Sequence, residues 1–397
     1  MSWAEQVGTA YAAPTVPDLG LDELLLKVSE LGGSDLHLTA GAPPTIRVRG
    51  EMTPVPGRPV LDPDGLRSGL YAIMTERQRQ TFEDTRELDF AHTLPGHARY
   101  RVNVYWQRES IGAVMRLIPW EIKPLADIGM PPVVESFARL KRGLVLVTGP
   151  TGSGKSTTLA SVIDLVNRTR RGHIMTIEDP IEFLHHHRGC LINQREVGSD
   201  THDFRTALKH VLRQDPDVIL VGELRDLDTI SVALTAAETG HLVLATLHTQ
   251  SAQDTISRVV DVFPANQQQQ IRTQLAATLQ GVVCQTLVPT VDGHSRIPAA
   301  EIMVCNSGIR AMIRDDKLPQ IPGALQSGAR EGMQTLDAHL AAHVRSGLIT
   351  REVGLEHCAN RTDFMSLVGS GASLPAGTAY AGRAVAPAHP TTNQGWS

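Results

Sequence analysis

The sequence predicts an α/β protein in which a small mixed N-terminal domain precedes a larger domain with a mostly parallel sheet. From residue 133 onward, apolar runs of strand length alternate with segments of helical apolar spacing. This alternation is typical of parallel strands covered by helices on both faces. A glycine-rich loop, Gly149 to Thr157, stands between one such strand and one such helix. Upstream, several strand-like runs follow a single amphipathic helical stretch.

The glycine-rich loop has the composition of a phosphate cradle. Its glycines let the backbone curl so that successive amide hydrogens point at phosphate oxygens, and the following helix N-terminus adds partial positive charge. Lys155 is placed to reach the outer phosphates, and the Ser156 hydroxyl to bind Mg²⁺. The alternative is a chance match to the motif in an ordinary turn, but the strand before the loop and the helix after it argue against chance. We expect the whole loop to bind a nucleotide: Gly149, Pro150, Thr151, Gly152, Ser153, Gly154, Lys155, Ser156 and Thr157.

The composition excludes several classes of protein. A net charge of −5 and an aromatic content of 4 % disfavour general nucleic-acid binding. The four cysteines are scattered singly, so neither a zinc site nor a disulfide framework is indicated. The start of the chain lacks a basic, apolar leader, and no run of about 18 apolar residues occurs. We therefore expect a cytoplasmic protein whose membrane contact is peripheral or made through a partner.

Composition also divides the chain into domains. Residues 1–20 read as a disordered leader, and residues 21–118 as the small α/β domain. Prolines punctuate residues 119–132, which we interpret as a hinge. Residues 133–368 form the larger domain and its C-terminal helices. Residues 369–397 are rich in Gly, Ala, Pro, Ser and Thr and are expected to be a disordered tail.

Carboxylates follow two of the predicted strands in the larger domain. Glu178 to Glu182 comes after one buried strand, and Glu223 comes after another. Ligands bind at the carboxyl edge of an open parallel sheet, where a carboxylate can orient water or hold magnesium. Gly222 stands where the strand-ending aspartate of a generic nucleotide site would be. Taken singly, each cluster could also be a solvated strand end.

Histidines and arginines are the next candidates. His241 begins a predicted strand and His248 ends it, so the two point to opposite faces or ends, and His248 is better placed to sense a terminal phosphate. For either, a packed or capping role remains open. The run from His185 to His187 reads as a solvated loop more readily than as a metal site. Arg101 and Arg116 flank the predicted hinge, and we expect them to reach across a subunit boundary.

Four motifs in order resemble the secretion ATPase superfamily. They are the glycine-rich loop, Thr176 to Glu182, Asp215 to Asp226, and Thr239 to Thr249. Within that superfamily, the chain is most similar to the motors that retract type IV pili. The likeness spans about Leu21 to Leu367.

The resemblance implies a PAS-like N-terminal domain and a RecA-like P-loop ATPase domain, assembled as a homohexamer that binds ATP and Mg²⁺ between subunits. It implies that Glu178 is the water-activating base, that Glu223 supports the metal, and that His241 and His248 form a histidine box. Ser156, Glu223 and Glu178 are then the expected metal-binding residues. The implied partners are an inner-membrane platform protein and the pilus base, at the inner face of the cytoplasmic membrane.

One motif departs from the family. The retraction branch carries Ala-Ile-Arg-Asn-Leu-Ile-Arg-Glu, and here Gly308 to Asp315 keeps both arginines but has Ala311 in place of asparagine. The four-cysteine zinc insertion common in assembly motors is missing from the sequence, which favours retraction over extension. The alternatives are a conjugation or secretion ATPase, an accessory pilus motor, a nucleotide-gated regulatory or scaffold protein, and a DNA translocase.

Overall fold

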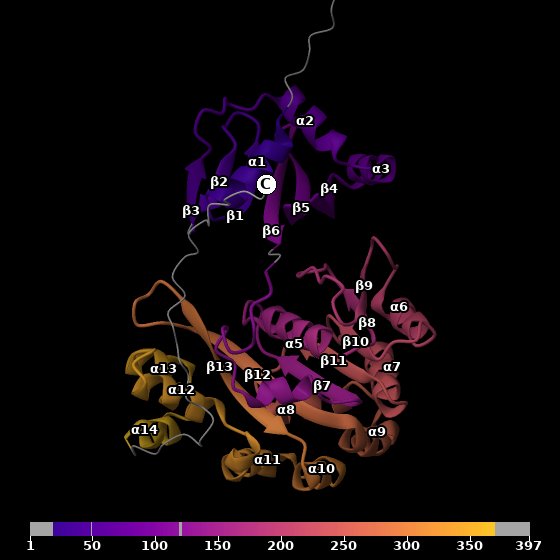
Figure 1. The fold of residues 1–397 in the computed structure, drawn as a ribbon, viewed down its shortest axis with the longest axis vertical. Coiled ribbons are helices and arrows are strands. Elements are labelled where there is room, and N and C mark those ends of the chain that lie inside the picture. The colour runs from indigo at the N-terminus through magenta and orange to yellow at the C-terminus, as the bar shows by residue number, and fades with distance from the viewer. Residues whose placement is uncertain (1–18, 49, 119–120, 370–397) are drawn as a thin grey trace, which may run out of the picture. The chain divides into compact units, whose positions relative to one another are not determined.

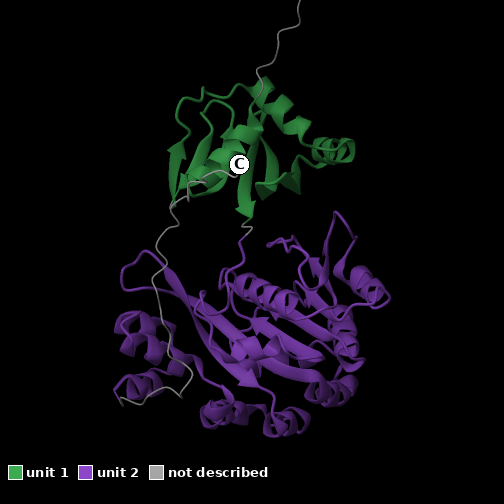
Figure 2. Ribbon diagram, in the orientation of Figure 1, with its two compact units in different colours: residues 1–120 green, residues 121–397 purple. Residues whose placement is uncertain are grey.

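The computed structural model describes residues 19–48, 50–118 and 121–369. The chain divides into two compact units, residues 1–120 and 121–397 (Figure 2). Most of the predicted leader, the first two residues of the predicted hinge and the tail from residue 370 lie outside the described residues. The predicted α/β fold class, with a mostly parallel sheet in the second unit and helices at its C-terminal end, is confirmed.

The first unit is built on a six-stranded antiparallel sheet in the order β3-β2-β1-β6-β5-β4 (Figure 1). Alternate residues of β5 show why it has one covered face, because Tyr100, Val102 and Val104 are fully buried while Arg101 is exposed. The elements are α1 (Leu21–Glu30), β1 (Gly33–Thr39), β2 (Thr45–Val48), β3 (Glu51–Pro54), α2 (Pro63–Ala72), α3 (Glu76–Thr85), β4 (Glu87–Leu94), β5 (Ala98–Gln107) and β6 (Ser110–Ile118).

Helices α2 and α3 were not anticipated from apolar spacing, although both carry clear start signals. Asp62 accepts a hydrogen bond from the amide of Gly65, and Pro63 follows at the first helical position. Thr75 and Gln78 form a reciprocal capping box at the start of α3. Capping chemistry, rather than an apolar stripe, defines these two short helices.

The second unit is built on a seven-stranded sheet in the order β13-β12-β7-β11-β10-β8-β9. All neighbouring strands are parallel except β12 and β13, which form an antiparallel hairpin. The strands are β7 (Gly143–Thr148), β8 (His173–Glu178), β9 (Leu191–Glu196), β10 (Val218–Val221), β11 (Leu242–Leu247), β12 (Leu279–Pro289) and β13 (Arg296–Val304).

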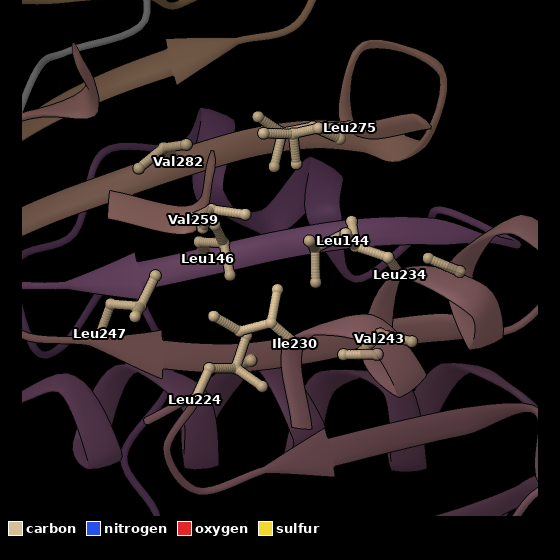
Figure 3. Packing of buried hydrophobic residues seen from close by; sticks show 14 of the residues in the cluster. Leu144, Leu146, Leu224, Ile230, Leu234, Val243, Leu247, Val259, Leu275 and Val282 are labelled. Carbon is tan, nitrogen blue, oxygen red and sulfur yellow. The ribbon is translucent and has the colours of Figure 1, made fainter. Parts of the chain in front are cut away.

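Strand β7 is buried along its whole length because both of its faces are covered. Leu144 and Leu146 pack into one cluster with side chains of α7, α8 and α9, as Figure 3 shows. Val145 and Val147 point the other way and pack against Leu159 and other residues of α5. Each such buried side chain stabilises the fold by about 1.5–3 kcal/mol. The strand that leads into the glycine-rich loop is therefore fixed from both sides.

The helices of the second unit begin and end close to the sequence signals. Ser251 accepts a hydrogen bond from the amide of Asp254 and starts α8. None of the helices in the described ranges combines the length and apolar character that crossing a bilayer requires. The α-helices are α4 (Val133–Phe137), α5 (Lys155–Thr169), α6 (Phe204–Val211), α7 (Leu227–Glu238), α8 (Ala252–Asp261), α9 (Ala265–Thr278), α10 (Ser307–Arg314), α11 (Ile321–Ser327), α12 (Leu336–Arg345), α13 (Arg351–His357) and α14 (Arg361–Gly369), with 3₁₀ turns η2 (Leu318–Gln320) and η3 (Ala329–Glu331).

Candidate functional site

The predicted motifs meet at one edge of the second sheet. Strands β7, β11, β10 and β8 are adjacent and parallel, so their carboxyl ends share an edge. The glycine-rich loop follows β7, His248 follows β11, Glu223 lies just beyond β10, and Glu178 ends β8. The sheet therefore arranges these groups in that spatial order, which differs from their order along the chain.

The glycine-rich loop has the conformation that a phosphate cradle needs. Gly149 has a φ of 140°, and a β-carbon there would lie 2.1 Å from the carbonyl oxygen of Gln285. Helix α5 begins at Lys155 with no side-chain cap, whereas Asp226 caps the start of α7. The Ser153 hydroxyl is buried without a hydrogen-bond partner in the described part of the chain. The loop thus offers amide and hydroxyl donors to an anion.

Lys155 is folded back onto this loop. Its Nζ donates to the carbonyl oxygens of Gly149, at 2.8 Å, and Pro150, at 3.0 Å. Burial lowers the pKa of Lys155, while the charges of Glu223 and Glu182 work against that shift. Both carboxylates therefore lie close enough to the ammonium group to affect it, although Glu223 follows β10 and Glu182 follows β8.

Glu223 is held between two donors. Its Oε1 lies 3.2 Å from Nε2 of His248, and its Oε2 accepts a hydrogen bond from Arg225 at 2.8 Å. Burial acts to raise the pKa of Glu223, but the hydrogen bonds and charges of Arg225 and His248 outweigh it, and the pKa is lowered. The carboxylate is ionised at neutral pH and 21 % exposed, so it remains accessible to a ligand.

Glu178 lies in a different environment. Its side chain is buried, and Oε1 accepts hydrogen bonds from Thr176, at 2.6 Å, and Gln194, at 3.2 Å. Burial raises its pKa. Strand β8 is three positions from β7, about 14 Å across the sheet, whereas β10 is two positions away, about 10 Å. Glu223 is thus on the nearer strand, and the water-activating role of Glu178 stays a prediction.

The structure gives a steric reason for the missing aspartate at Gly222. A β-carbon there would lie 3.2 Å from the carbonyl oxygen of Ile177 and 3.3 Å from the Cα of Glu178. Both atoms are backbone atoms of β8, which is fixed in the sheet. A side chain at this position would press on the strand that carries Glu178, so glycine fits here with less strain than aspartate.

His241 is not brought to this edge. It precedes β11 at the amino end, where its ring Nδ1 lies 3.0 Å from the carbonyl oxygen of Ala236. Its own carbonyl oxygen accepts a hydrogen bond from Gly143, at the start of β7. The length of β11 puts it about 20 Å from His248. Within one chain, His241 and His248 therefore do not form one site.

Arg101 and Arg116 belong to the first unit, whereas the glycine-rich loop belongs to the second. They are cross-strand neighbours on β5 and β6. Arg116 pairs with Asp35 at 2.8 Å, and Arg101 lies 3.8 Å from Asp89. Their side chains are 69 % and 50 % exposed, so both guanidinium groups are accessible from solvent.

The structure tests the remaining metal predictions. His186 and His187 are exposed, as predicted for a solvated loop, but His185 is half-buried, and burial lowers its pKa to about 4. Across the described ranges, no group of three or more His, Cys, Asp or Glu is arranged to hold a metal by itself. The Ser156 hydroxyl and the Glu223 carboxylate are oxygen donors of the kind that Mg²⁺ prefers, with phosphate oxygens completing its shell.

Gln285 supports the loop and was not anticipated. It is buried on β12, where its Nε2 donates to the carbonyl oxygen of Ser153 at 2.8 Å. Its Oε1 accepts a hydrogen bond from the Thr158 hydroxyl at 2.9 Å. The available signal was a glutamine next to the apolar run Val282 to Cys284.

A sequence model of the "Type II/IV secretion system protein" family matches residues 102–365 of this chain. The matched range contains the whole of the edge site. The chain belongs to this family.

Similar proteins from this secretion family cover most of the chain. The chain is 51 % identical to the "Type IV pilus retractation ATPase PilT" of Pseudomonas aeruginosa, over 84 % of this chain and 96 % of the relative. It is 40 % identical to the "Type IV pilus ATPase PilU" of the same organism, over 89 % of this chain and 93 % of that relative. A crystal structure of the pilus retraction motor PilT with bound ADP covers 87 % of this chain and 99 % of its own, with 46 % identity and a TM-score of 0.82.

Proposed function

We propose that this chain is an ATP-hydrolysing motor that assembles as a homohexamer and powers the retraction of type IV pili. One observation supports the chemistry. The P-loop, followed by a helix whose start has no side-chain cap, lies at the same sheet edge as the ionised carboxylate of Glu223 and its partner His248. The biological role rests on 51 % identity to a PilT over nearly the full length of that relative. The ADP in the solved PilT is consistent with nucleotide binding at this P-loop.

The residues of the edge divide the work of hydrolysis. The loop amides and Lys155 hold the phosphates of ATP, and Ser156 together with Glu223 or Glu178 would hold Mg²⁺, which supplies neutralising charge when bound. Glu223 orients the attacking water, and His248 lies where it can sense the terminal phosphate. Glu178 remains a second candidate for the base. We propose that Arg101 and Arg116 act on this site across a subunit boundary. His241 lies at the opposite end of β11 from His248, so its proposed contribution is also to the site of a neighbouring subunit.

Hydrolysis would be coupled to movement through the joint between the units. Closure around ATP and opening after hydrolysis would turn one unit against the other at residues 119–132. The proposed partners are an inner-membrane platform protein and the pilus base, which places the motor at the inner face of the cytoplasmic membrane. No nucleic acid takes part.

Deletion of the gene in its native organism tests this proposal. A retraction motor predicts cells with extra surface pili that no longer twitch, because filaments assemble but are not withdrawn. A chain with Lys155→Ala should fail to restore movement. Cells without pili would instead identify an assembly motor and overturn the proposal.

A second candidate is an accessory pilus motor, favoured by the 40 % identity to PilU over 93 % of that relative. Such a protein would support a principal retraction motor encoded elsewhere. Expression of this chain alone, in a strain that lacks every other retraction motor, separates the two possibilities. Restored twitching supports the principal role, and twitching that returns only with a second motor supports the accessory role.

A further inference from the structure

The second unit contains a cavity of about 1000 Å³ that is separate from the nucleotide edge. No residue of the glycine-rich loop lines it, and neither do Glu178, Glu223 or His248. Its walls come from residues 131–133, the start of α8, β13, and helices α11, α12 and α14. Cavities that bind drug-sized molecules have volumes of about 300–1000 Å³, so this space is large enough for a whole organic ligand.

The chemistry of the walls is apolar with an acidic side. Much of the lining is aliphatic, with Pro131, Pro132, Ile321, Leu325, Met333 and Leu336. The charged lining residues, all within the described ranges, are three acids, Glu301, Asp337 and Asp363, and one base, Arg330. A ligand that fits this lining has an apolar body and carries positive charge.

Glu301 is the acid with binding capacity left. Its Oε1 accepts a hydrogen bond from the amide of Ala252 at 2.7 Å, the one hydrogen bond that its carboxyl makes within the described part of the chain. Asp337 differs, because its two oxygens already accept from the amides of Ala359, at 2.7 Å, and Asn360, at 2.9 Å. Burial raises the pKa of Glu301, and the charges of Asp254 and Asp337 add to the shift. A cation beside Glu301 would stabilise its ionised carboxylate and so oppose the rise in pKa.

We propose that this cavity is a binding site for a small organic cation, an amine whose apolar body fills the space and whose ammonium group pairs with Glu301. The site also has a route to the nucleotide edge. The hydrogen bond from Ala252 fixes β13 to the start of α8, and Ser251, which caps that helix, lines the cavity. His248 lies three residues before Ser251 along the chain. The start of α8 thus links the cavity to the residues that directly follow β11.

Dansylcadaverine, a fluorescent apolar amine, is a direct probe of the site. Titration into the full-length protein should give saturable binding of one probe per chain. Glu301→Gln keeps the acceptor for Ala252 but removes the charge, and Ala338→Leu fills the cavity from its wall. Each substitution should weaken binding at least tenfold. Glu356→Gln, at an exposed position outside the cavity, should leave it unchanged.

The controls separate the possible results. Dansylamide has the same ring system without the amine and should bind at least tenfold more weakly than dansylcadaverine. Thermal unfolding of each variant checks that it is folded, and two chemically different variants keep the test independent of either one. Equal affinity in wild type, Glu301→Gln and Ala338→Leu would overturn the proposal, as would no saturable binding at all. Because binding is measured without ATP, a failure here is distinguishable from a failure of the motor function.

Discussion

His248 and Glu223 face each other across neighbouring strands, with Nε2 of the histidine 3.2 Å from Oε1 of the carboxylate. Arg225 holds the other oxygen at 2.8 Å. A carboxylate that is held through both oxygens loses rotational freedom and stays ionised. A fixed, ionised carboxylate is suited to orienting a water molecule. Of Glu178 and Glu223, the strand order places Glu223 on the strand nearer to the P-loop.

The first prediction compares the two acids directly. Glu223→Gln should lower kcat for ATP hydrolysis about 100-fold or more while ATP binding is retained, because the amide keeps the shape but loses the charge. Glu178→Gln should cost less, since its carboxyl lies on a strand farther from the loop. Steady-state hydrolysis and nucleotide binding by the purified protein measure both. A larger loss in Glu178→Gln than in Glu223→Gln would restore Glu178 as the base.

The sequence was sufficient to predict the edge but not its internal order. A strand that is followed by a glycine-rich loop, an acid or a histidine can be recognised from the local sequence. In a parallel sheet the carboxyl ends of the strands lie at one edge, so these groups come together there. The order β7-β11-β10-β8 depends on which strands pair, which is decided by packing between residues far apart in the chain. For that reason Glu178 and Glu223 were both found, while their unequal distance from the loop was not.

Strand β9 and Gln285 escaped prediction for a related reason. The sequence of β9, Leu191–Glu196, contains one buried apolar residue, Ile192, so it lacks the apolar run that marked the other strands. It forms by pairing with β8 at the sheet edge. Gln194 on this strand is one of the groups that hold Glu178. Residues that support a site through tertiary contacts carry little local signal.

The second prediction concerns the support that Gln285 gives to the P-loop. Gln285→Leu leaves the carbonyl oxygen of Ser153 and the hydroxyl of Thr158 buried without their partner, at a cost of about 1–3 kcal/mol for each unsatisfied group. The variant should unfold at lower urea concentration and show a raised KM for ATP. Gln285→Glu keeps the bond from Thr158 but puts a buried carboxylate oxygen against the carbonyl oxygen of Ser153, so its loss should be at least as large. Unchanged stability in both would show that the bonds contribute nothing.

The third prediction separates the two arginines of the departing motif. Arg310 donates to the carbonyl oxygens of Ala276, at 2.6 Å, and Ala277, at 3.1 Å, at the end of α9. These are carbonyls that the helix itself cannot satisfy. Arg314 is 53 % exposed and pairs with its neighbour Asp315. Arg310→Ala should therefore lower the free energy of unfolding by about 1–3 kcal/mol, and Arg314→Ala by less than about 0.5 kcal/mol.

Urea unfolding of the two purified variants checks this difference. A twitching assay adds information about partners, because Arg314→Ala should impair movement only if the exposed arginine contacts another protein. Equal destabilisation by the two substitutions would contradict the capping role of Arg310.

The last prediction rests on two histidines buried between β13 and α12. The rings of His339 and His343 lie 4.3 Å apart, His339 Nδ1 accepts from the amide of Ala300 at 2.9 Å, and His343 Nε2 lies 3.0 Å from the carbonyl oxygen of Pro298. Burial lowers the pKa of both, most strongly for His339, where the charge of His343 adds to the shift. The folded protein therefore keeps both neutral at a pH where the unfolded chain protonates them.

The sign of the pH dependence follows from this difference. Below about pH 6.5 the unfolded chain binds more protons than the folded one, so stability falls as the pH is lowered, by up to about 1.4 kcal/mol per pH unit for each histidine. His185, with a pKa lowered to about 4, contributes with the same sign. The melting temperature should drop between pH 7.5 and 5.5, and less steeply in His343→Gln, which keeps a donor for Pro298. His294→Gln, at an exposed position, should retain the wild-type slope, and an equal slope in all three proteins would contradict the assignment.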